Sequence, residues 1–226
     1  MAETPVKPCL KICGNTNIED VRLVGASGAE YCGILVNVAF SERSLSLQRA
    51  AELASESKIP TVILVCDPRI EEVEEVVVEI KPFAVQLLGH EPPELVRELK
   101  SGLQCRVWKT IHLPLVSGQA SPEKYARAGA DALLVDSVDT SEGFQRLGGT
   151  GKVADWKAAA AIIKAVTIPV FLAGGINPGN VEKAITEVRP YGIDLCSGVE
   201  GSRGKKDPEK LRNLVKNFRS AIEKLS

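Results

Sequence analysis

The sequence predicts an α/β fold, a single closed (β/α)8 barrel of the TIM type, and three observations indicate it. Short runs rich in β-branched residues alternate with amphipathic stretches along the whole chain. The chain has 226 residues, so eight repeats of about 28 residues use its full length, as in a closed parallel barrel. No linker-like stretch interrupts the alternation. We therefore expect one catalytic domain over residues 1–226, with no length left for a fused enzyme.

Eight runs are expected to form the barrel strands. They are mostly apolar because a strand of such a barrel is buried on both faces. In chain order the expected strands are Cys9–Cys13, Tyr31–Val36, Thr61–Val65, Phe83–Leu87, Arg106–Ile111, Ala132–Asp136, Val170–Ala173 and Ile193–Ser197.

Signals for helix starts follow several of these runs closely. Thr16 with Glu19 matches a capping box. Three further starts place a side-chain acceptor directly before a proline: Asp67-Pro68, Ser121-Pro122 and Asn177-Pro178. The loops between strand and helix then gather at the C-terminal mouth of the barrel, where such folds place their chemistry. The longest of these loops, residues 137–155, is polar and rich in glycine.

An open, doubly wound sheet shares this alternation and is the alternative fold. Its usual Gly-x-Gly-x-x-Gly turn is absent after the first expected strand, which favours the barrel.

Composition limits the partners. With 28 basic and 29 acidic residues, the formal charge is −1, so no excess of positive charge is available for nucleic acid or an anionic membrane. No signal-peptide core and no run of about 18 to 20 apolar residues occurs. We expect a cytoplasmic protein with a small-molecule partner. The six cysteines lie in or beside apolar runs, and we expect reduced thiols.

A structural zinc site is not expected, because the chain has no Cys-x-x-Cys pair and only two histidines, His90 and His112. The acidic run 71–75 and the basic run 203–206 are expected to be solvated surface. Trp108 and Trp156 are expected to pack in the core.

Polar residues end two of the expected strands. Alternation along the first strand places Cys13 on the same face as Lys11, toward the barrel interior. Lys11 then needs a partner to remain charged, and we expect Asp194 on the neighbouring last strand to provide it. Asp136 ends an apolar run, where a carboxylate is costly unless it is solvated, paired or needed. Its alternative role is to cap or anchor the loop that follows.

Two glycine-containing turns follow the last two strands, at Gly174-Gly175 and at Ser197-Gly198. Exposed backbone N–H groups at such turns form a phosphate site in this class of barrel. Gly149 and Gly151 in the long sixth loop are expected to close over the same region. If the glycines only permit tight turns, they carry no ligand.

Seven stretches, in order along the chain, resemble the phosphoribosylanthranilate isomerase family of tryptophan biosynthesis. Together they cover nearly the whole chain, and most of them stand at the ends of the expected strands. They are Lys11–Gly14 with Glu19-Asp20, Ser41–Arg43, Val85–Leu87, Leu133–Ser137, Gly148–Gly151 with Asp155-Trp156, Leu172–Pro178 and Asp194–Glu200.

The resemblance implies the roles of the site residues. Cys13 would be the general base, Asp136 the general acid, and Arg43 the group that binds the anthranilate carboxylate through its planar fork. The substrate-binding set would be completed by Asp194 and by the glycine turns: Gly149, Gly151, Gly174, Gly175, Ser197 and Gly198. The protein would work without a cofactor or metal, as a monomer or a homodimer.

The implied reaction converts N-(5-phosphoribosyl)anthranilate to 1-(2-carboxyphenylamino)-1-deoxyribulose 5-phosphate, an Amadori rearrangement. Asp136 would protonate the ribose ring oxygen, and Cys13 would remove the proton from C2′. These roles require a raised pKa for Asp136 and a lowered pKa for Cys13.

Two positions depart from the family pattern. Leu88 stands where the family usually has a histidine, with His90 two residues later, and Glu42 replaces a common proline beside Arg43. Two other functions remain open at this point. One is another phosphosugar isomerase of the same fold, such as the aminoimidazole-carboxamide ribotide isomerase of histidine biosynthesis, for which carboxylates in both roles would be expected. The other is a phosphate-binding barrel without turnover.

Overall fold

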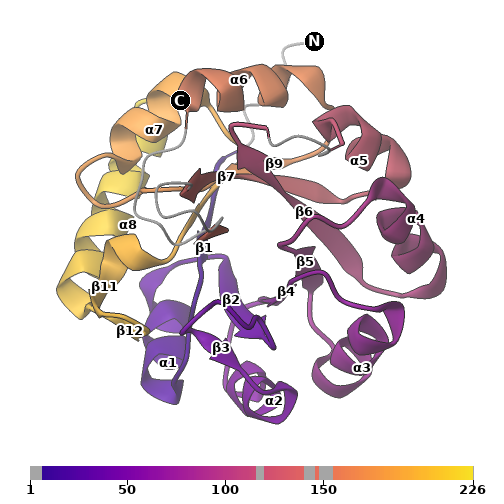
Figure 1. Cartoon of the computed structure of the whole chain (residues 1–226). Coiled ribbons are helices and arrows are strands. Elements are labelled where there is room, and N and C mark those ends of the chain that lie inside the picture. Colours follow the sequence, from indigo (N-terminus) through magenta and orange to yellow (C-terminus); the bar gives the residue numbers. More distant parts are fainter. Residues whose placement is uncertain (1–6, 116–119, 140–145, 148–154, 226) are drawn as a thin grey trace.

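A computed structural model describes residues 7–115, 120–139, 146–147 and 155–225, which form a barrel of parallel strands enclosed by helices (Figure 1). The barrel strands are β1 (Cys9–Ile12), β2 (Tyr31–Val36), β4 (Thr61–Val65), β5 (Ala84–Leu87), β6 (Arg106–Leu113), β7 (Ala132–Asp139), β9 (Val170–Leu172) and β10 (Gly192–Leu195). The helices are α1 (Ile18–Ser27), α2 (Leu47–Ser55), α3 (Ile70–Ile80), α4 (Pro93–Gly102), α5 (Pro122–Ala128), α6 (Trp156–Ala165), α7 (Val181–Val188) and α8 (Pro208–Glu223).

The strands close on themselves. Hydrogen bonds run in the order β1, β10, β9, β7, β6, β5, β4, β2, and β1 pairs with β2 to complete the circle. Every pairing in this circle is parallel. An open sheet would leave β1 and β2 unpaired at one side. The predicted (β/α)8 barrel is therefore confirmed, and the open alternative is wrong.

Short elements decorate the C-terminal mouth. They are β3 (Ser44–Leu45), which extends beside β2, β8 (Arg146–Leu147), which runs antiparallel to β7, the 3-10 helix η1 (Ser197–Val199), and the hairpin β11 (Glu200–Ser202) with β12 (Lys205–Lys206). Among the described residues, no helix has both the length and the apolar character that crossing a membrane requires.

The expected strands agree with the observed ones to within three residues at each end. The runs 31–36 and 61–65 are reproduced without change. Cys13 lies one residue beyond the end of β1, and β7 continues three residues beyond Asp136. The Cys13 backbone N–H nevertheless donates to the carbonyl of Leu195, so its position is fixed by the neighbouring β10.

Three of the four expected helix caps are wrong. Asn17, and not Thr16, caps α1, because the Thr16 hydroxyl donates to the Gly204 carbonyl instead. Asp67 and Asn177 both lie before the residues that begin α3 and α7, where the caps are Arg69 and Asn180. The Asp67 carboxylate accepts from the His90 backbone, and the Asn177 side chain accepts from Gly179 within its own turn.

The fourth expected start is correct. Ser121 is the residue before α5, and Pro122 is its first helical position.

Aromatic side chains fill the barrel below the mouth. Trp108 stacks on Phe171 with ring centroids 4.9 Å apart, and Tyr31 meets Trp108 edge-on at 5.2 Å. Apolar residues from other strands, including Leu134, complete this layer. Trp108 is thus a core residue as predicted, and Trp156 is half-buried against the outer core. Because this layer is closed, polar groups higher in the barrel can face only the mouth.

Candidate active site

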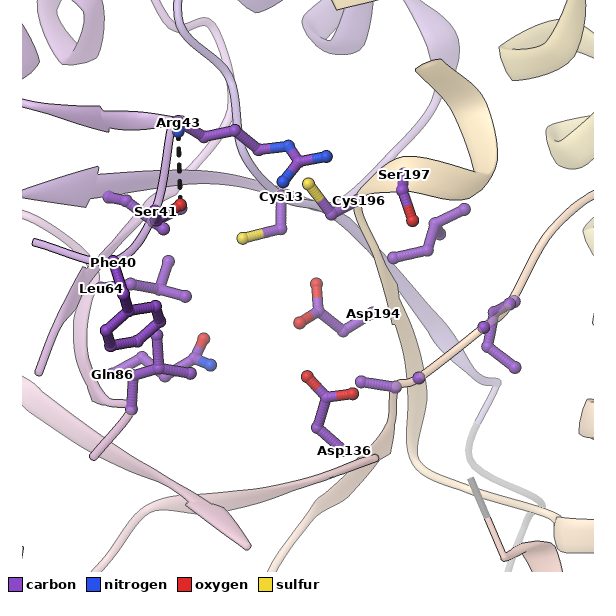
Figure 2. A pocket seen from close by; sticks show the side chains of 17 residues that line it. Cys13, Phe40, Ser41, Arg43, Leu64, Gln86, Asp136, Asp194, Cys196 and Ser197 are labelled. Atoms are coloured by element: carbon purple, nitrogen blue, oxygen red, sulfur yellow. Dashed lines mark hydrogen bonds between the residues drawn. The ribbon is translucent and has the colours of Figure 1, made fainter. Parts of the chain in front are cut away.

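A pocket opens at the C-terminal mouth of the barrel, above the aromatic layer (Figure 2). Its walls come from the ends of strands and from the loops that follow them. It is lined by Cys13, Leu35, Phe40, Ser41, Arg43, Leu64, Gln86, Leu88, Asp136, Ala173, Gly174, Gly175, Ile176, Asp194, Leu195, Cys196 and Ser197. Most of the residues expected at the site fall in or beside this region.

Cys13 and Asp136 project into the pocket from different sides, with the Asp194 side chain between them in the view of Figure 2. Cys13 follows β1 and Asp136 lies in β7, two strands that are separated in the barrel by β10 and β9. A ligand in this pocket can therefore contact a thiol on one side and a carboxyl group on the other.

The Cys13 thiol is buried, with 6% of the residue exposed. Burial raises the pKa of the thiol, while the ammonium groups of Lys11 and Lys206 act in the opposite direction. The net effect is a pKa above the usual thiol value, so the lowered pKa expected from the sequence is wrong. Burial prevails because water, which would solvate a thiolate, is largely excluded.

Lys11 and Asp194 form the ion pair expected between the first and last strands. Lys11 Nζ lies 2.9 Å from Asp194 Oδ1, and the two residues are direct neighbours in the β1–β10 register. Burial acts against the Lys11 charge, but Asp194 and Cys13 together outweigh it and raise the pKa of the ammonium. The prediction of this pair is confirmed, and Lys11 stays charged beside Cys13.

Asp136 has the electrostatics that an acid at neutral pH requires. Burial raises the pKa of its carboxyl group to about 7. The Ser137 backbone N–H donates to Asp136 Oδ1 at 2.7 Å and limits this rise, because it stabilises the charged form. About half of these carboxyl groups hold a proton near neutral pH.

The two glycine turns lie against one another beside Asp136. Gly174 and Gly175 both have positive φ, 81° and 64°, which a residue with a side chain rarely adopts. A Cβ on Gly198 would lie 2.0 Å from the Ile176 carbonyl oxygen, so the loop after β10 packs directly on the loop after β9. The N–H groups of Gly174 and Gly175 donate to no other described residue. Gly149 and Gly151 lie outside the described residues.

Arg43 is held in place by a carboxylate of the protein itself. Its Nε and Nη2 donate to the two oxygens of Glu200 at 2.7 and 2.6 Å, and the pair is buried. The hydrogen bonds to Glu200 raise the pKa of the guanidinium. Nη1 donates to none of the described residues, so one edge of the guanidinium remains available on the pocket side. The charge of the pair is balanced, so this edge can bind a carboxylate mainly through hydrogen bonds.

Glu42 does not compete for Arg43. Its carboxylate forms an exposed ion pair with Arg203. The carboxylate that does contact Arg43, Glu200, lies 157 positions away in the sequence. Glu200 stands in a stretch that matches the family, but no local pattern indicated its role.

The basic run 203–206 is not uniformly solvated, contrary to the expectation from the sequence. Arg203 and Lys205 are exposed, but Lys206 is 3% exposed and its Nζ donates to the Cys13 carbonyl at 2.6 Å. The hairpin register turns alternate residues to opposite faces, and Lys206 takes the inward face opposite Glu200. The glutamates of the acidic run 71–75 are exposed as expected.

Three further pocket residues were not expected from the sequence. Phe40 lies at the rim with 44% of its surface exposed, and Cys196 lies beside Arg43. Gln86 donates to Thr110 at 3.0 Å, while its buried Oε1 has no hydrogen-bond partner among the described residues. Gln86 lies near the end of β5 in a stretch that resembles the family, and this position could have indicated that it lines the pocket.

No cluster of three or more His, Cys, Asp or Glu side chains in the described part of the chain is placed to hold a metal ion.

Comparison with known families decides the relationship. A family model described as N-(5′-phosphoribosyl)anthranilate (PRA) isomerase matches residues 10–217. The chain belongs to this family. The PRA isomerase of Methanocella arvoryzae is 37% identical over 213 residues, which are 93% of this chain and 97% of that protein.

Solved structures of PRA isomerases have the same fold. Monomers of the dimeric PRA isomerase from Thermotoga maritima match with a TM-score of 0.78 and 30% identity, covering 94% of this chain and 99% of theirs. A PRA isomerase in complex with reduced 1-(o-carboxyphenylamino)-1-deoxyribulose 5-phosphate matches with a TM-score of 0.75 and 28% identity, at the same coverage. The family and the isomerase class predicted from the sequence are confirmed.

One departure from the PRA isomerase pattern changes the pocket. Leu88 is buried and contributes an apolar wall, whereas His90 is exposed and does not replace the missing histidine. The buried His112 holds the Leu88 carbonyl through Nε2 at 2.7 Å, and Nε2 must carry the proton because a carbonyl oxygen only accepts. This side of the pocket is therefore apolar in this chain.

Proposed function

We propose that this protein isomerises N-(5′-phosphoribosyl)anthranilate to 1-(2-carboxyphenylamino)-1-deoxyribulose 5-phosphate in tryptophan biosynthesis, with Asp136 as general acid and Cys13 as general base. The observation that carries the assignment is the placement of these two groups around one pocket, with the pKa of Asp136 raised to about 7. The whole chain would act as one domain, with no cofactor or metal.

The reaction begins with a proton transfer from Asp136 to the ribose ring oxygen while the bond from that oxygen to C1′ breaks. The products of this step are an open-chain protonated Schiff base and the Asp136 carboxylate. The Cys13 thiolate then takes the proton from C2′, and the electron pair of that bond forms an enolamine. Loss of the C2′ hydroxyl proton and gain of a proton at C1′ give the ketone, so the isomerisation is balanced in atoms and electrons.

The two ends of the substrate would be bound by different parts of the mouth. The turns containing Gly174, Gly175, Ser197 and Gly198 would offer backbone N–H groups to the phosphate. The open edge of Arg43 would bind the anthranilate carboxylate. The apolar wall around Phe40 and Leu88 would then face the aromatic ring, and Asp194 would border the sugar.

The decisive experiment follows the loss of substrate fluorescence with purified protein. We expect turnover by the parent, and a loss of about 10² to 10⁴ in kcat for Cys13→Ser and for Asp136→Asn. Cys105→Ser is the matched control, because Cys105 precedes β6 at the far end of the barrel and should leave kcat unchanged. Full activity of Cys13→Ser would refute the proposed base. A folded parent without turnover would instead favour a binding barrel.

The role of Arg43 has its own test. Arg43→Lys keeps a cation beside Glu200 but loses the planar fork, so we expect KM to rise with little change in kcat. The parent should bind a reduced product analogue with the carboxylate more tightly than one without it, and the variant should bind both with similar Ki. Equal discrimination by both proteins would show that the carboxylate binds elsewhere.

We further propose a cytoplasmic location and a monomeric or homodimeric assembly, as one relative is described as dimeric. Light scattering on the purified protein distinguishes the two assemblies.

A further inference from the structure

Lys206 is a buried ammonium group that the reaction described above leaves without a role. Its side chain is fully buried in the hairpin that follows β10. Burial of an ammonium group is costly, so such a side chain is retained only with partners that stabilise its charge. Those partners identify what Lys206 does.

The shortest contact of the Lys206 ammonium is with the base-bearing residue. Nζ donates to the Cys13 carbonyl at 2.6 Å and to the Cys196 carbonyl at 3.4 Å. The nearest carboxylate oxygen, Glu200 Oε1, is also 3.4 Å away, and Glu200 already makes two shorter bonds to Arg43. Lys206 is therefore a cation that its carboxylate neutralises only in part.

The backbone on both sides of Lys206 is fixed. Its N–H donates to Asp20 Oδ2 at 2.9 Å, and the N–H of the next residue, Asp207, donates to the Val199 carbonyl at 2.8 Å. The Asp207 side chain then caps α8. The backbone that carries the Lys206 ammonium group is consequently held in place beside the Cys13 loop.

The other charges around Cys13 are arranged in pairs. Lys11 lies below it and is paired with Asp194, and Arg43 is paired with Glu200. The carboxyl group of Asp136 is across the pocket and is half protonated near pH 7. The ionisable groups near the thiol are Lys11, Cys32, Arg43, Asp194, Cys196 and Lys206. Within the described part of the chain, Lys206 is the one of these cations that lacks a carboxylate within 3 Å.

We propose that Lys206 is a positioning residue for Cys13, which fixes the Cys13 carbonyl and adds to the positive charge of Lys11 in stabilising the thiolate. The inference rests on the proposed function, because a thiolate at Cys13 matters only if Cys13 is the base. Glu200 sets the strength of this effect, since it shares its carboxylate between Lys206 and Arg43.

The test measures the thiolate directly, without turnover. Cys13 is alkylated with iodoacetamide over a range of pH, and the modified peptide is quantified by mass spectrometry. For Lys206→Met we expect alkylation near pH 7.5 to slow by about three- to tenfold and the midpoint to move to higher pH, because only the thiolate reacts. Lys206→Arg should stay close to the parent. Lys205→Met, the same change at the adjacent exposed position, should have no effect.

A second variant should shift the alkylation midpoint of Cys13 in the opposite direction. Glu200→Gln removes the charge that partly neutralises Lys206, so alkylation of Cys13 should become faster and its midpoint should move to lower pH. If the hairpin has a purely structural role, both variants should change the alkylation rate of Cys13 in the same direction. Such a role cannot move the midpoint to higher pH in one variant and to lower pH in the other. An unchanged midpoint in both variants overturns the proposal, even if one of them is destabilised.

Parallel measurement of kcat/KM against pH separates this proposal from the proposed function. If the alkylation midpoint and the thiol limb of activity move together, both are supported. If the midpoint moves and the activity limb does not, Cys13 is not the base, although Lys206 still stabilises its thiolate. If neither moves while Cys13→Ser is inactive, Cys13 remains the base and Lys206 has no influence on it.

Discussion

At the scale of single residues, the site places the proposed acid and the proposed base in environments that both favour the protonated form. Burial raises the pKa of Asp136 to about 7, and it also raises the pKa of Cys13 above 9.0. The acid is therefore ready near neutral pH, whereas the base must be deprotonated against its surroundings. This imbalance affects both the activity and the stability of the isomerase.

The pH dependence of kcat/KM, which reports the free enzyme, should reflect both groups. The active form needs a protonated Asp136 and a deprotonated Cys13. Because the pKa of the acid is lower than that of the base, activity should rise up to about pH 7, remain level, and fall above the pKa of the thiol. The break near pH 7 then belongs to Asp136. In Asp136→Asn the residual activity should keep rising beyond pH 7, and a variant that retains the break would contradict the assignment.

The stability of Asp136→Asn should depend on pH in a defined direction. The pKa is raised in the folded state from 3.8, so the folded chain binds more protons than the unfolded chain between pH 3.8 and 7. Stability is therefore lost as the pH rises through this window. The variant cannot ionise and keeps the acceptor for the Ser137 N–H, so we expect it to be more stable at pH 8 by about 2 to 4 kcal/mol. Urea unfolding at pH 8 and pH 4 measures this, and the gain should disappear at the lower pH.

At the scale of elements, the loops after β9 and β10 act as one unit because they touch. Gly198 lies against the backbone of Ile176, so the two loops are packed directly on one another. The hairpin β11/β12 extends this unit from η1 to the loop after β1. The glycine turns after β9 and β10 and the loop that carries Cys13 are thus joined through packed backbone.

Gly198→Ala tests this contact. The added Cβ would meet the Ile176 carbonyl at 2.0 Å, so the loops must separate, and we expect a loss of about 1 to 3 kcal/mol in stability together with a higher Ki for inorganic phosphate. Gly102→Ala is the matched control, because its Cβ would meet nothing within 4 Å. An unchanged Ki for phosphate in Gly198→Ala would argue against a phosphate site at these turns.

The sequence predicted the elements better than their ends. Strand runs such as 61–65 are recognisable because burial on both faces selects apolar, β-branched residues locally. The caps of α1, α3 and α7 were missed because Thr16, Asp67 and Asn177 use their side chains on distant backbone or on their own turns. The local pattern cannot show such competition, since the partner of Thr16 is Gly204.

At the scale of the whole molecule, the barrel brings the two ends of the sequence together, and this determined which site residues could be predicted. Lys11 and Asp194 could be paired because closure makes the first and last strands neighbours. Arg43 with Glu200, and Lys206 with Cys13, could not, because their contacts depend on how loops fold above the barrel. Cys13 and Asp136 were recognisable because each follows an apolar run and lies in a stretch that resembles the family.

A buried histidine gives the whole fold a predictable acid sensitivity. Burial lowers the pKa of His112 from 6.5 to about 4. Between these pH values the imidazole is protonated in the unfolded chain but not in the folded chain. The folded chain therefore loses stability as the pH falls from 6.5 to 4. Between pH 7 and pH 5 the contribution of His112 should fall by about 2 kcal/mol, while that of Asp136 changes in the opposite direction. His112→Gln keeps a donor for the Leu88 carbonyl and should remove this contribution, which urea unfolding of parent and variant at both pH values measures. His90→Gln, at the exposed histidine, should not, and equal slopes in both variants would show that His112 is not the source of the acid sensitivity.

The aromatic layer formed by Trp108, Phe171 and Tyr31 plugs the barrel at its opposite end. Among the described residues, the pocket therefore has a single opening. The phosphosugar enters and its ketose isomer leaves through this opening. Both molecules carry the same phosphate and the same carboxylate, so each would occupy the proposed phosphate and carboxylate sites that the other requires. Accumulated product should accordingly slow the enzyme by simple competition, and the flux through the step then depends on how quickly the following reaction removes it.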